Sequence, residues 1–540
     1  MRSRGSIYTL GLSTLVILLL LTLPAQASVI DEVRNIIKHQ YVDEVDGDIL
    51  AQPTIKDILT ELNDPYSAYM NVEEYQEFLN SIGDTTITGI GVQIEAVNEG
   101  MLVLKVFAGS PADKAGIKSG DVITSVDGSP LSGLSTEQGV TLIRGPKDSE
   151  INLTIMRGNS TLNFKTMRDD ILIPSVEGTM INESIGYISI DSFGEETPWN
   201  FARVLYDLKD ANSYIIDLRN NGGGYVDAVL GIAGHFIGGQ IAVKAETRDG
   251  SYDFHAHNWG GIVDKPVVLL VNEYSASASE ILTAAAKDYG KALVIGTTTF
   301  GKGTIQTLFV AGEGVLKLTT ARFFSPQGNA IDKLGVSPDL TIINNDPLDA
   351  AALLLGYSEY SPDPDEMVTI RIGKEVYTVD RRMAISPDYW PVFKEIMDAL
   401  PEYTLYMTGE SSKWQVTAKD EYSFLPILYP GYTRMENLKE VPTNKDFILT
   451  FQEKIDKNTV SNRTIELIRI DTGERVNIIF HYLSPNKLVV SPYKPLEAGQ
   501  EYLLVVQPGI NLSGSDETPG GFITTITVKE TTGGTVLLVA

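Results

Sequence analysis

The chain of 540 residues contains no cysteine and only five histidines. The absence of cysteine excludes disulfide bonds, thiol nucleophiles and cysteine-ligated metals, so burial of apolar surface must hold the fold together.

Basic residues are also scarce, 43 against 70 acidic ones, which gives a formal net charge of −27. This acidic balance argues against nucleic acid or anionic lipid as the main partner.

Long apolar runs are scarce as well, and the main one lies at the N-terminus. Arg2 and Arg4 precede an apolar run from Leu15 to Leu23, and Ala25-Gln26-Ala27 follows it. This pattern predicts a secretory signal peptide over residues 1–27, cleaved before Ser28. The apolar run is shorter than the roughly 20 residues that a membrane span needs, although an uncleaved N-terminal anchor is an alternative. We therefore expect an exported, extracytoplasmic protein, with a net charge of −29 (41 basic and 70 acidic side chains) after cleavage.

A serine and a lysine, Ser277 and Lys302, occur in a pattern that favours nucleophilic catalysis. Ser277 lies three residues before the start of the helix-forming stretch 280–286, so it is predicted to lie at or just before a helix N-terminus, where free N–H groups favour developing negative charge. Gly301 and Gly303 flank Lys302 and let the backbone pack closely around it. Burial lowers the pKa of a lysine, and a neutral amine can remove a serine proton. Either pattern alone is common in helix caps and turns, but their occurrence in one strand–helix–strand unit indicates a hydrolase.

Acyl transfer also needs hydrogen-bond donors for the oxyanion, and a glycine-rich turn is a candidate source of them. The stretch from Tyr214 to Leu218 is predicted to be a buried strand, and it continues into Gly222, Gly223 and Gly224. Backbone N–H groups in such a turn can point into a cleft. A phosphate-binding loop is the alternative, but the lysine and hydroxyl expected after its glycines are absent.

The histidines offer two rival interpretations. His255 and His257 alternate on a predicted strand, but no third ligand accompanies them at a recognisable spacing, so we predict no metal and no cofactor. A histidine-based triad with His235 is a further alternative. No Gly-x-Ser-x-Gly sequence surrounds Ser277, which favours the serine and lysine pair.

The segment from Val271 to Gln306 closely resembles the C-terminal processing peptidases, also called tail-specific proteases. The resembling motifs are Val-Asn-Glu-Tyr-Ser-Ala-Ser-Ala-Ser-Glu-Ile, which starts at Val271, and Phe-Gly-Lys-Gly-Thr-Ile-Gln, which ends at Gln306. Further family-like motifs occur in the family's order between about Ser28 and Asp346. The resemblance implies that Ser277 is the nucleophile, that Lys302 is the general base and that Gln306 positions the lysine.

The resemblance also assigns the oxyanion hole. It implies that the N–H groups of Gly223 and Ala278 bind the oxyanion, while Ser275 and Ser279 serve the turn and the helix start. Many family members have proline where this chain has Gly222, so the turn is expected to be looser here.

A PDZ domain is expected over residues 82–165. Gly89, Ile90, Gly91 and Val92 resemble the loop that binds the carboxylate of a peptide C-terminus with backbone N–H groups, so these four are the predicted peptide-binding residues. Arg144 matches an arginine that links the peptide-bound PDZ domain to the protease domain in relatives, and we assign it a regulatory role. A solvated arginine before a turn is an equally simple explanation.

The sequence as a whole predicts a multidomain α+β fold. The expected order is the signal peptide (1–27), an N-terminal helical segment (28–81), the PDZ domain (82–165), an α/β protease core (166–345), an uncharacterised α+β module (346–430), an all-β domain (431–530) and a tail (531–540). By resemblance, the core has the fold shared by crotonase and the Clp-type proteases, and the all-β region is similar to a bacterial immunoglobulin-like domain.

The function predicted from these features is that of an exported serine endopeptidase. It would recognise unstructured C-termini of protein substrates through the PDZ domain and cleave them by way of an acyl-enzyme. A homodimer through the N-terminal helices and cell-wall contact through the immunoglobulin-like domain are the further partners that the resemblances suggest. The alternative is a catalytically idle adaptor of the cell envelope, which the presence of Ser277, Lys302 and Gln306 disfavours.

Overall fold

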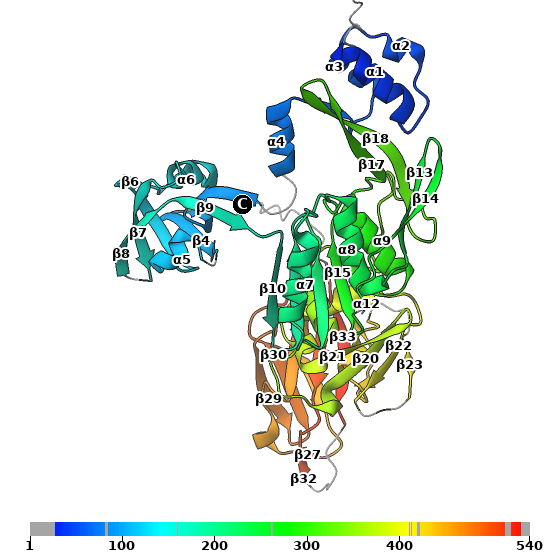
Figure 1. The fold of residues 1–540 in the computed structure, drawn as a ribbon. Coiled ribbons are helices and arrows are strands. Elements are labelled where there is room, and N and C mark those ends of the chain that lie inside the picture. Colours follow the sequence, from blue (N-terminus) through cyan, green and yellow to red (C-terminus); the bar gives the residue numbers. More distant parts are fainter. Residues whose placement is uncertain are drawn as a thin grey trace, which may run out of the picture. The chain divides into compact units, whose positions relative to one another are not determined.

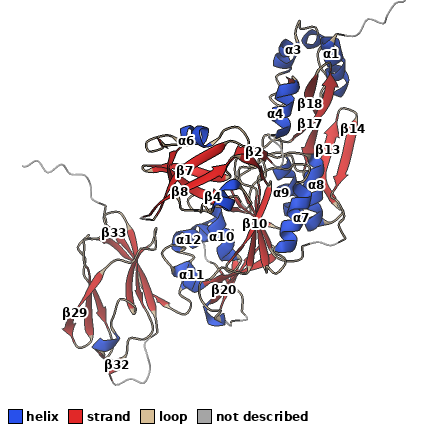
Figure 2. Ribbon diagram, turned by 60° about the vertical axis from the view of Figure 1, so that its left-hand side comes forward, coloured by secondary structure: helices blue, strands red, loops and turns tan. Residues whose placement is uncertain are grey.

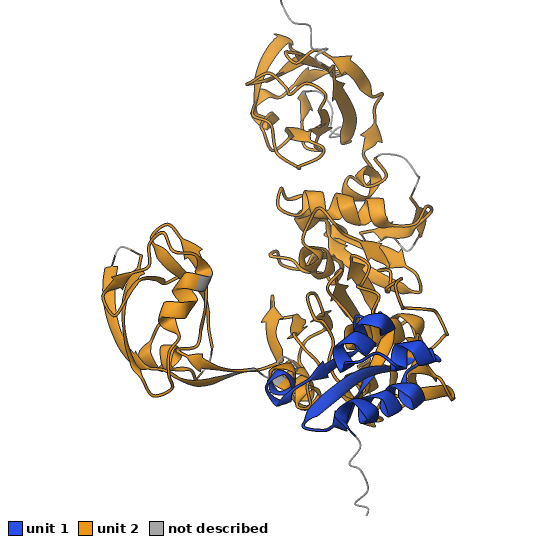
Figure 3. Cartoon of the chain, turned by 90° about the horizontal axis from the view of Figure 1, so that it is seen from above, with its two compact units in different colours: residues 1–76, 306–321 blue, residues 77–305, 322–540 orange. Residues whose placement is uncertain are grey.

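A computed structural model describes residues 28–80, 85–107, 109–158, 160–260, 263–409, 411, 413–417, 422–513 and 520–530. The chain falls into two compact units, residues 1–76 with 306–321 and residues 77–305 with 322–540, which are described separately (Figure 3). The predicted signal peptide (1–27) and tail (531–540) lie outside the described residues. Within these described ranges, no helix is long and apolar enough to cross a membrane.

The first unit begins with three helices, α1 (Val29–Gln40), α2 (Gly47–Leu50) and α3 (Ile55–Leu62) (Figure 1). Ser28 and Thr54 cap α1 and α3, because each side chain accepts a hydrogen bond from the backbone N–H three residues later. Val33 and Ile58 come from the apolar faces of these helices, and they pack with Leu316 in a small core. The helical prediction for the N-terminal segment is therefore confirmed for these elements.

One stretch of this segment is extended instead of helical. Strand β1 (Ala68–Met70) pairs antiparallel with β18 (Gly314–Phe324), which in turn pairs with β17 (Thr304–Ala311). The main-chain hydrogen bonds that β18 offers explain why these three residues leave the helical pattern. Helix α4 (Val72–Asn80) then leads out of the first unit.

The PDZ domain follows in the second unit. Its strands are β2 (Thr85–Gly89), β3 (Val92–Val97), β4 (Gly100–Val106), β5 (Val122–Val126), β6 (Ser129–Pro130), β7 (Glu150–Arg157), β8 (Ser160–Met167) and β9 (Asp169–Ile173), with helices α5 (Pro111–Ala115) and α6 (Thr136–Ile143). The main sheet has the order β3-β4-β5-β7-β8, with β6 paired to β5, and β2 pairs with β9. Figure 2 shows β7 and β8 of this domain as red strands and α6 as a blue helix. Strand β3 lies at the edge of its sheet, where an added strand can pair.

The region between residues 166 and 345 contains a six-stranded sheet. In spatial order its strands are β10 (Val176–Ile181), β11 (Ile185–Ile190), β12 (Ser213–Asp217), β15 (Val267–Val271), β16 (Leu293–Gly296) and β19 (Leu340–Thr341). All neighbours pair in parallel except β10 with β11. The buried strand predicted from Tyr214 to Leu218 is confirmed as β12. The helices of this region are α7 (Thr197–Asp207), α8 (Val226–Ile237) and α9 (Ala278–Asp288), and a hairpin is formed by β13 (Ile241–Thr247) and β14 (Gly250–His255).

Both faces of this sheet are covered, which explains its nearly continuous apolar strands. Ile216 of β12 packs in a core with α8 and α9, whereas its neighbour Ile215 faces a second core on the other side. That second core contains α10 (Pro347–Leu354). The region predicted to be a separate α+β module therefore completes the burial of this six-stranded sheet.

The rest of this module has the expected mixture of strands and helices. It consists of η1 (Pro364–Glu366), β20 (Met367–Ile372), β21 (Glu375–Asp380), α11 (Arg381–Ile385), α12 (Trp390–Ala399), β22 (Leu405–Thr408), β23 (Gln415–Val416) and α13 (Leu425–Leu428). Its sheet has the order β21-β20-β22-β23.

The C-terminal region is an immunoglobulin-like arrangement of short strands, as predicted. One sheet contains β24 (Thr433–Arg434), β25 (Leu438–Val441), β33 (Phe522–Val528), β31 (Glu501–Val506) and β28 (Ile465–Arg469), and another contains β26 (Phe447–Thr450), β30 (Lys487–Pro492) and β29 (Ile478–Ser484). The remaining elements are β27 (Lys454–Ile455), η2 (Lys457–Thr459) and β32 (Leu512–Ser513). Trp390 of the preceding module donates a hydrogen bond from its indole N–H to Ile470 O at 2.7 Å, so the two regions are joined by more than the linker.

Candidate active site

Ser277 occupies the sharp turn between β15 and α9. It is the N-cap residue of α9, with φ 57° and ψ −110°. This backbone conformation is unfavourable for a residue with a Cβ, and such strain concentrates at functional sites. The prediction that Ser277 lies at a helix N-terminus is confirmed.

The two neighbouring serines have structural roles. Ser275 and Ser279 are fully buried, and each donates its hydroxyl hydrogen to a backbone carbonyl, that of Leu218 at 2.7 Å and that of Asn221 at 2.9 Å. They tie the turn of Ser277 to the glycine-rich turn after β12. The geometry thus favours Ser277, which is partly exposed, over both neighbours as the nucleophile.

The predicted oxyanion donors lie beside Ser277. A Cβ built on Gly223 would lie 2.7 Å from the Cβ of Ser277 and 3.0 Å from the nitrogen of Ala278. Gly223 has φ +103°, and the approach is too close for any side chain. The glycine turn and the start of α9 are therefore brought together as the resemblance implies.

One of these donors is engaged inside the protein. Gly223 N–H donates to Asn221 Oδ1 at 2.8 Å, and the Nδ2 of the same side chain donates to Ile190 O at 2.7 Å. Asn221 is fully buried, and its backbone carbonyl accepts a hydrogen bond from Ala276 N–H at 2.9 Å. An oxyanion bound by Gly223 would have to take the place of the Asn221 carboxamide oxygen.

Lys302 lies in the loop that precedes β17 and is partly buried. Its backbone N–H donates to Glu280 Oε2 at 2.8 Å, and Ser277 N–H donates to the same oxygen at 2.8 Å. The backbone nitrogens of the predicted base and nucleophile are thus held on one carboxylate oxygen. Gly303 lies close to Asp332, with 2.3 Å between its ideal Cβ position and Asp332 N, which confirms the expected tight packing of this loop.

Gln306 lies on β17 in the first unit. Its Nε2 donates to Thr319 Oγ1 of β18 at 3.3 Å. The expected role of Gln306 toward Lys302 stays a prediction.

Two residues that hold this site together were not predicted, Glu280 and Asn221. Glu280 lies three residues after Ser277, and a Ser-x-x-Glu spacing is typical of a capping box. This spacing could have predicted the hydrogen bond between Glu280 and the N–H of Ser277. Asn221 contacts Gly223 two residues later, but its bonds to Ile190, Ala276 and Ser279 link segments far apart in the chain, and no local sequence pattern predicts them.

An ion-pair network lies at the end of β12. Arg219 forms ion pairs with Asp217 at 2.6 Å and with Asp346, the N-cap of α10, at 2.7 Å. Tyr187 donates its hydroxyl hydrogen to Asp217 at 2.9 Å, and burial together with the Asp217 carboxylate raises the pKa of Tyr187. This network anchors the strand from which the glycine turn departs.

The histidines occupy other environments. His235 is packed between Phe201 and Trp259, with ring centroids 5.5 and 5.8 Å away, and burial lowers its pKa. His257 Nε2 lies 3.2 Å from Asp227 Oδ1. No group of three histidine or acidic side chains suited to a metal occurs among the described residues.

The predicted carboxylate loop of the PDZ domain lies between β2 and β3. Gly91 has φ +81°, and a Cβ there would lie 2.3 Å from the Cβ of Ser110, whereas a Cβ on Gly89 would meet nothing within 4 Å. Ile90 is buried in the PDZ core. Arg144 is exposed and is the C-cap residue of α6, so its predicted regulatory role rests on the resemblance alone.

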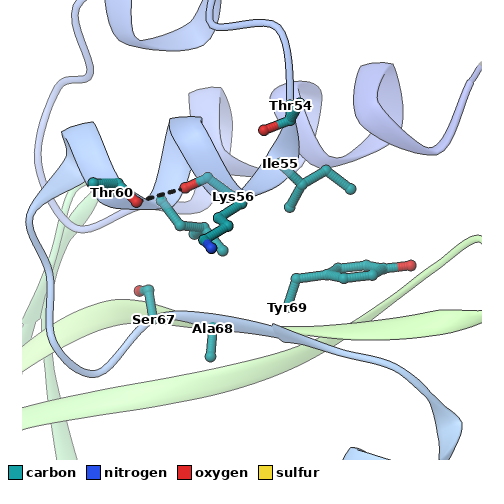
Figure 4. Close-up of a pocket in the computed structure, with 8 residues that line it drawn as sticks. Thr54, Ile55, Lys56, Thr60, Ser67, Ala68 and Tyr69 are labelled. Atoms are coloured by element: carbon teal, nitrogen blue, oxygen red, sulfur yellow. Dashed lines mark hydrogen bonds between the residues drawn. The ribbon is translucent and has the colours of Figure 1, made fainter.

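An open hollow of about 680 Å³ lies in the first unit, between α3 and β1 (Figure 4). Ile55, Leu59 and Tyr69 contribute to its apolar lining. The Thr60 hydroxyl donates to Lys56 O at 2.8 Å. None of these lining residues was a predicted site residue.

Sequence profiles of four domains match this chain. Peptidase family S41 matches residues 184–342, the PDZ domain 88–167, the activating protease CtpB N-terminal domain 22–74 and a bacterial Ig-like domain 435–520. The predicted fold class, with a helical N-terminal region, a PDZ domain, a protease core and an immunoglobulin-like domain, is confirmed.

Individual proteins also match. The carboxy-terminal processing protease CtpB of Bacillus subtilis (strain 168) is 35% identical over 335 residues, which cover 60% of this chain and 70% of that protein. CtpA of the same organism is 37% identical over 311 residues, 56% of this chain and 66% of that protein. A solved photosystem II D1 C-terminal processing protease is similar with a TM-score of 0.38 and 26% identity, covering 58% of this chain and 92% of that one.

These matches define an S41-type peptidase equipped with a PDZ domain. The chain belongs to the carboxy-terminal processing proteases, which are serine-type peptidases. Since the family is enzymatic, the matches favour the peptidase over the idle adaptor.

Proposed function

We propose that this peptidase uses Ser277 as its nucleophile and Lys302 as its general base. The observation that carries the proposal is the position of Ser277, which lies at a strained helix N-terminus against Gly223 while its backbone shares a carboxylate oxygen with that of Lys302. The hydroxyls of Ser275 and Ser279 are engaged elsewhere, so Ser277 is the serine suited to attack.

In the proposed mechanism, Ser277 Oγ attacks the scissile carbonyl carbon while its proton passes to the neutral amine of Lys302. The carbonyl oxygen becomes an oxyanion that accepts hydrogen bonds from the N–H groups of Gly223 and Ala278. Collapse of this intermediate breaks the C–N bond, and Lys302 returns the proton to the departing amine. Water then attacks the acyl-enzyme with the same base, which releases the new C-terminus and restores Ser277.

Oxyanion binding requires a small rearrangement in this mechanism. The Asn221 carboxamide gives up the Gly223 N–H, and the oxyanion replaces it as the acceptor. Gln306 is proposed to orient the amine of Lys302, as the resemblance implies.

Trapping of the acyl-enzyme tests this proposal. Acid quenching during turnover of a denatured protein substrate, followed by protease digestion and mass spectrometry, is expected to show an acyl adduct on the peptide that contains Ser277. The Ser277→Ala protein, treated identically, is expected to show none. An adduct on another residue of the wild-type protein would refute the assignment.

We further propose that the PDZ domain captures the C-termini of unstructured proteins. The tight turn at Gly91 and the position of β3 at a sheet edge support this, because carboxylate capture with strand addition needs a fixed loop beside an unpaired strand. Comparison of new C-termini made by wild-type and Ser277→Ala protein would identify the substrates.

We propose that the protein is exported and that residues 1–27 are its signal peptide. The N-terminal arginines, the short apolar run and Ala25-Gln26-Ala27 support this proposal. N-terminal sequencing of the protein recovered outside the cytoplasm is expected to begin at Ser28. A start at Met1 would indicate an uncleaved anchor instead.

Two assembly roles are also proposed. The N-terminal helices form a homodimer interface, as the family resemblance suggests, and analytical ultracentrifugation is expected to give twice the mass of the chain. The immunoglobulin-like domain contacts the cell wall, and the full-length protein is expected to sediment with purified cell-wall material. The mass of a monomer would refute the homodimer. Protein that stays in the supernatant would refute the contact with the cell wall.

A further inference from the structure

Glu280 is a fully buried carboxylate in the first turn of α9. Its Oε1 accepts hydrogen bonds from Thr299 Oγ1 and Gly301 N–H, both at 2.7 Å. Its Oε2 accepts hydrogen bonds from the N–H groups of Ser277 and Lys302, both at 2.8 Å. Four donors therefore surround one buried side chain.

Helix capping explains only one of these four contacts. A glutamate at the third position of a helix commonly accepts a hydrogen bond from the N-cap N–H, which here is that of Ser277. The other three donors come from residues 299–302, which lie 19 to 22 positions later in the chain. Burying a carboxylate is costly unless its lone pairs are satisfied, so a residue that only capped the helix would not be buried in this way.

A further hydrogen bond holds the loop that donates to Glu280. Thr299 is buried, and its hydroxyl accepts a hydrogen bond from Val336 N–H at 2.7 Å while it donates to Glu280. The loop before Lys302 is thereby fixed between α9 and the segment that contains Val336. Glu280 connects this fixed loop to the turn of Ser277.

We propose that Glu280 is a positioning residue for catalysis, which sets the spacing between Ser277 and Lys302 by holding both backbones on one carboxylate. The inference rests on the proposed roles of Ser277 and Lys302. Proton transfer from the serine hydroxyl to the lysine amine needs heavy atoms within about 2.6–3.2 Å of each other. The side chain of lysine is long and flexible, so its amine can occupy many positions. Holding the backbone of Lys302 in place limits the positions that this amine can occupy.

Substitution of Glu280 by glutamine tests this inference. The amide retains one acceptor oxygen, but its NH₂ group faces two of the four donors, so the loop and the turn can no longer share the side chain. A misplacement of about 1 Å at a reacting group can cost about 100-fold in rate. We therefore expect Glu280→Gln to lower kcat by about 100-fold on a denatured protein substrate, with KM changed by less than about threefold.

Glu273 provides the matched control, since it is an exposed glutamate that accepts a hydrogen bond from Thr297 Oγ1 at 2.9 Å. Glu273→Gln is expected to retain wild-type kcat and KM. A purely structural role for Glu280 would lower the yield or the melting temperature and leave kcat per folded molecule unchanged. An unchanged kcat in folded Glu280→Gln protein would overturn the inference.

A second pair of variants covers the case in which Glu280→Gln does not fold. Thr299→Val removes the hydroxyl that donates to Glu280, whereas Thr299→Ser keeps it. Loss of a hydrogen bond to a charged group corresponds to about a tenfold effect. We expect Thr299→Val to lower kcat about tenfold and Thr299→Ser to restore it, and equal kcat values in both would overturn the inference.

The same assays separate this inference from the proposed mechanism. If Ser277→Ala and Lys302→Ala are inactive while folded Glu280→Gln is fully active, only the positioning role is refuted. If Ser277→Ala retains activity, the proposed mechanism is refuted and the positioning role with it.

Discussion

Gly223 and Ser277 approach each other so closely that a Cβ on the glycine would lie 2.7 Å from the Cβ of the serine. Gly223 also has φ +103°, so an alanine there would be strained and would displace the turn of Ser277. Because the N–H of Gly223 is a proposed oxyanion donor, we expect Gly223→Ala to lower kcat by at least about 100-fold. Initial rates on a denatured protein substrate measure this effect.

Gly222 supplies the control for this prediction. It is exposed, and a Cβ there would meet nothing within 4 Å. Gly222→Ala is expected to keep kcat within about twofold of wild type. Equal activities of Gly223→Ala and Gly222→Ala would show that the close approach has no role in catalysis.

The active site was predictable where its signals are local. The strand before Gly223, the helix after Ser277 and the tight loop around Lys302 follow from apolar runs, helix propensity and glycine spacing. The choice of Ser277 over two other serines depends on the family resemblance and stays a prediction; the hydroxyls of the other two serines donate to the buried backbone carbonyls of Leu218 and Asn221.

Other features depended on contacts between distant segments. Three of the four donors of Glu280 come from residues 299–302, and Asn221 contacts Ile190 and Ser279, which are also distant in the chain, so no spacing rule predicts these bonds. In the fold, β1 was missed inside a helical pattern because its partner β18 lies more than 240 residues later. Local sequence patterns likewise do not predict that α10 shares a core with the six-stranded sheet.

The PDZ loop gives a second prediction. A Cβ on Gly91 would lie 2.3 Å from the Cβ of Ser110, and its φ of +81° suits glycine. Gly91→Ala is expected to weaken binding of a peptide with a free C-terminal carboxylate by at least about tenfold, since the backbone N–H groups lose their alignment. Isothermal titration calorimetry measures this change.

The ligand provides the control for the PDZ prediction. The same peptide with a C-terminal amide is expected to bind wild-type and Gly91→Ala protein equally weakly. If the amidated peptide binds wild-type protein as tightly as the free acid, the loop does not recognise the carboxylate.

Trp390 gives a third prediction, on stability. Its side chain is buried, and its indole N–H donates a hydrogen bond to Ile470 O. Gly473 packs closely against it, because a Cβ built on Gly473 would lie 2.5 Å from the Cβ of Trp390. Trp390→Ala is expected to lower the free energy of unfolding of the C-terminal region by about 3–5 kcal/mol. Urea denaturation followed by limited proteolysis measures the loss, with the 70% exposed Trp199 as the control position. Equal stabilities of Trp390→Ala and Trp199→Ala would show that the immunoglobulin-like domain is only loosely attached.

His235 gives a fourth prediction, on pH dependence. Burial lowers the pKa of His235 below its ordinary value of 6.5, so on acidification the unfolded chain binds a proton before the folded protein does. The free energy of unfolding is therefore expected to fall as the pH drops through 6.5, and to stop falling only below the folded-state pKa. The melting temperature of His235→Phe should decline less than that of wild type between pH 8 and pH 5.5.

The exposed Trp199 is the control for this effect, because its side chain does not titrate. Trp199→Phe is expected to show the pH dependence of the wild-type protein. Identical pH profiles for wild type and His235→Phe would contradict the role assigned to burial of this histidine.

The central claim is that Lys302 activates Ser277, and the rate at which purified Lys302→Ala protein cleaves a denatured substrate tests it most directly. Lys287→Ala is the matched control, because Lys287 forms a surface ion pair with Asp339 at 2.9 Å. The account predicts no detectable cleavage by Lys302→Ala and wild-type cleavage by Lys287→Ala, with both proteins folded and still able to bind a C-terminal peptide. Cleavage by Lys302→Ala at the wild-type rate would contradict it.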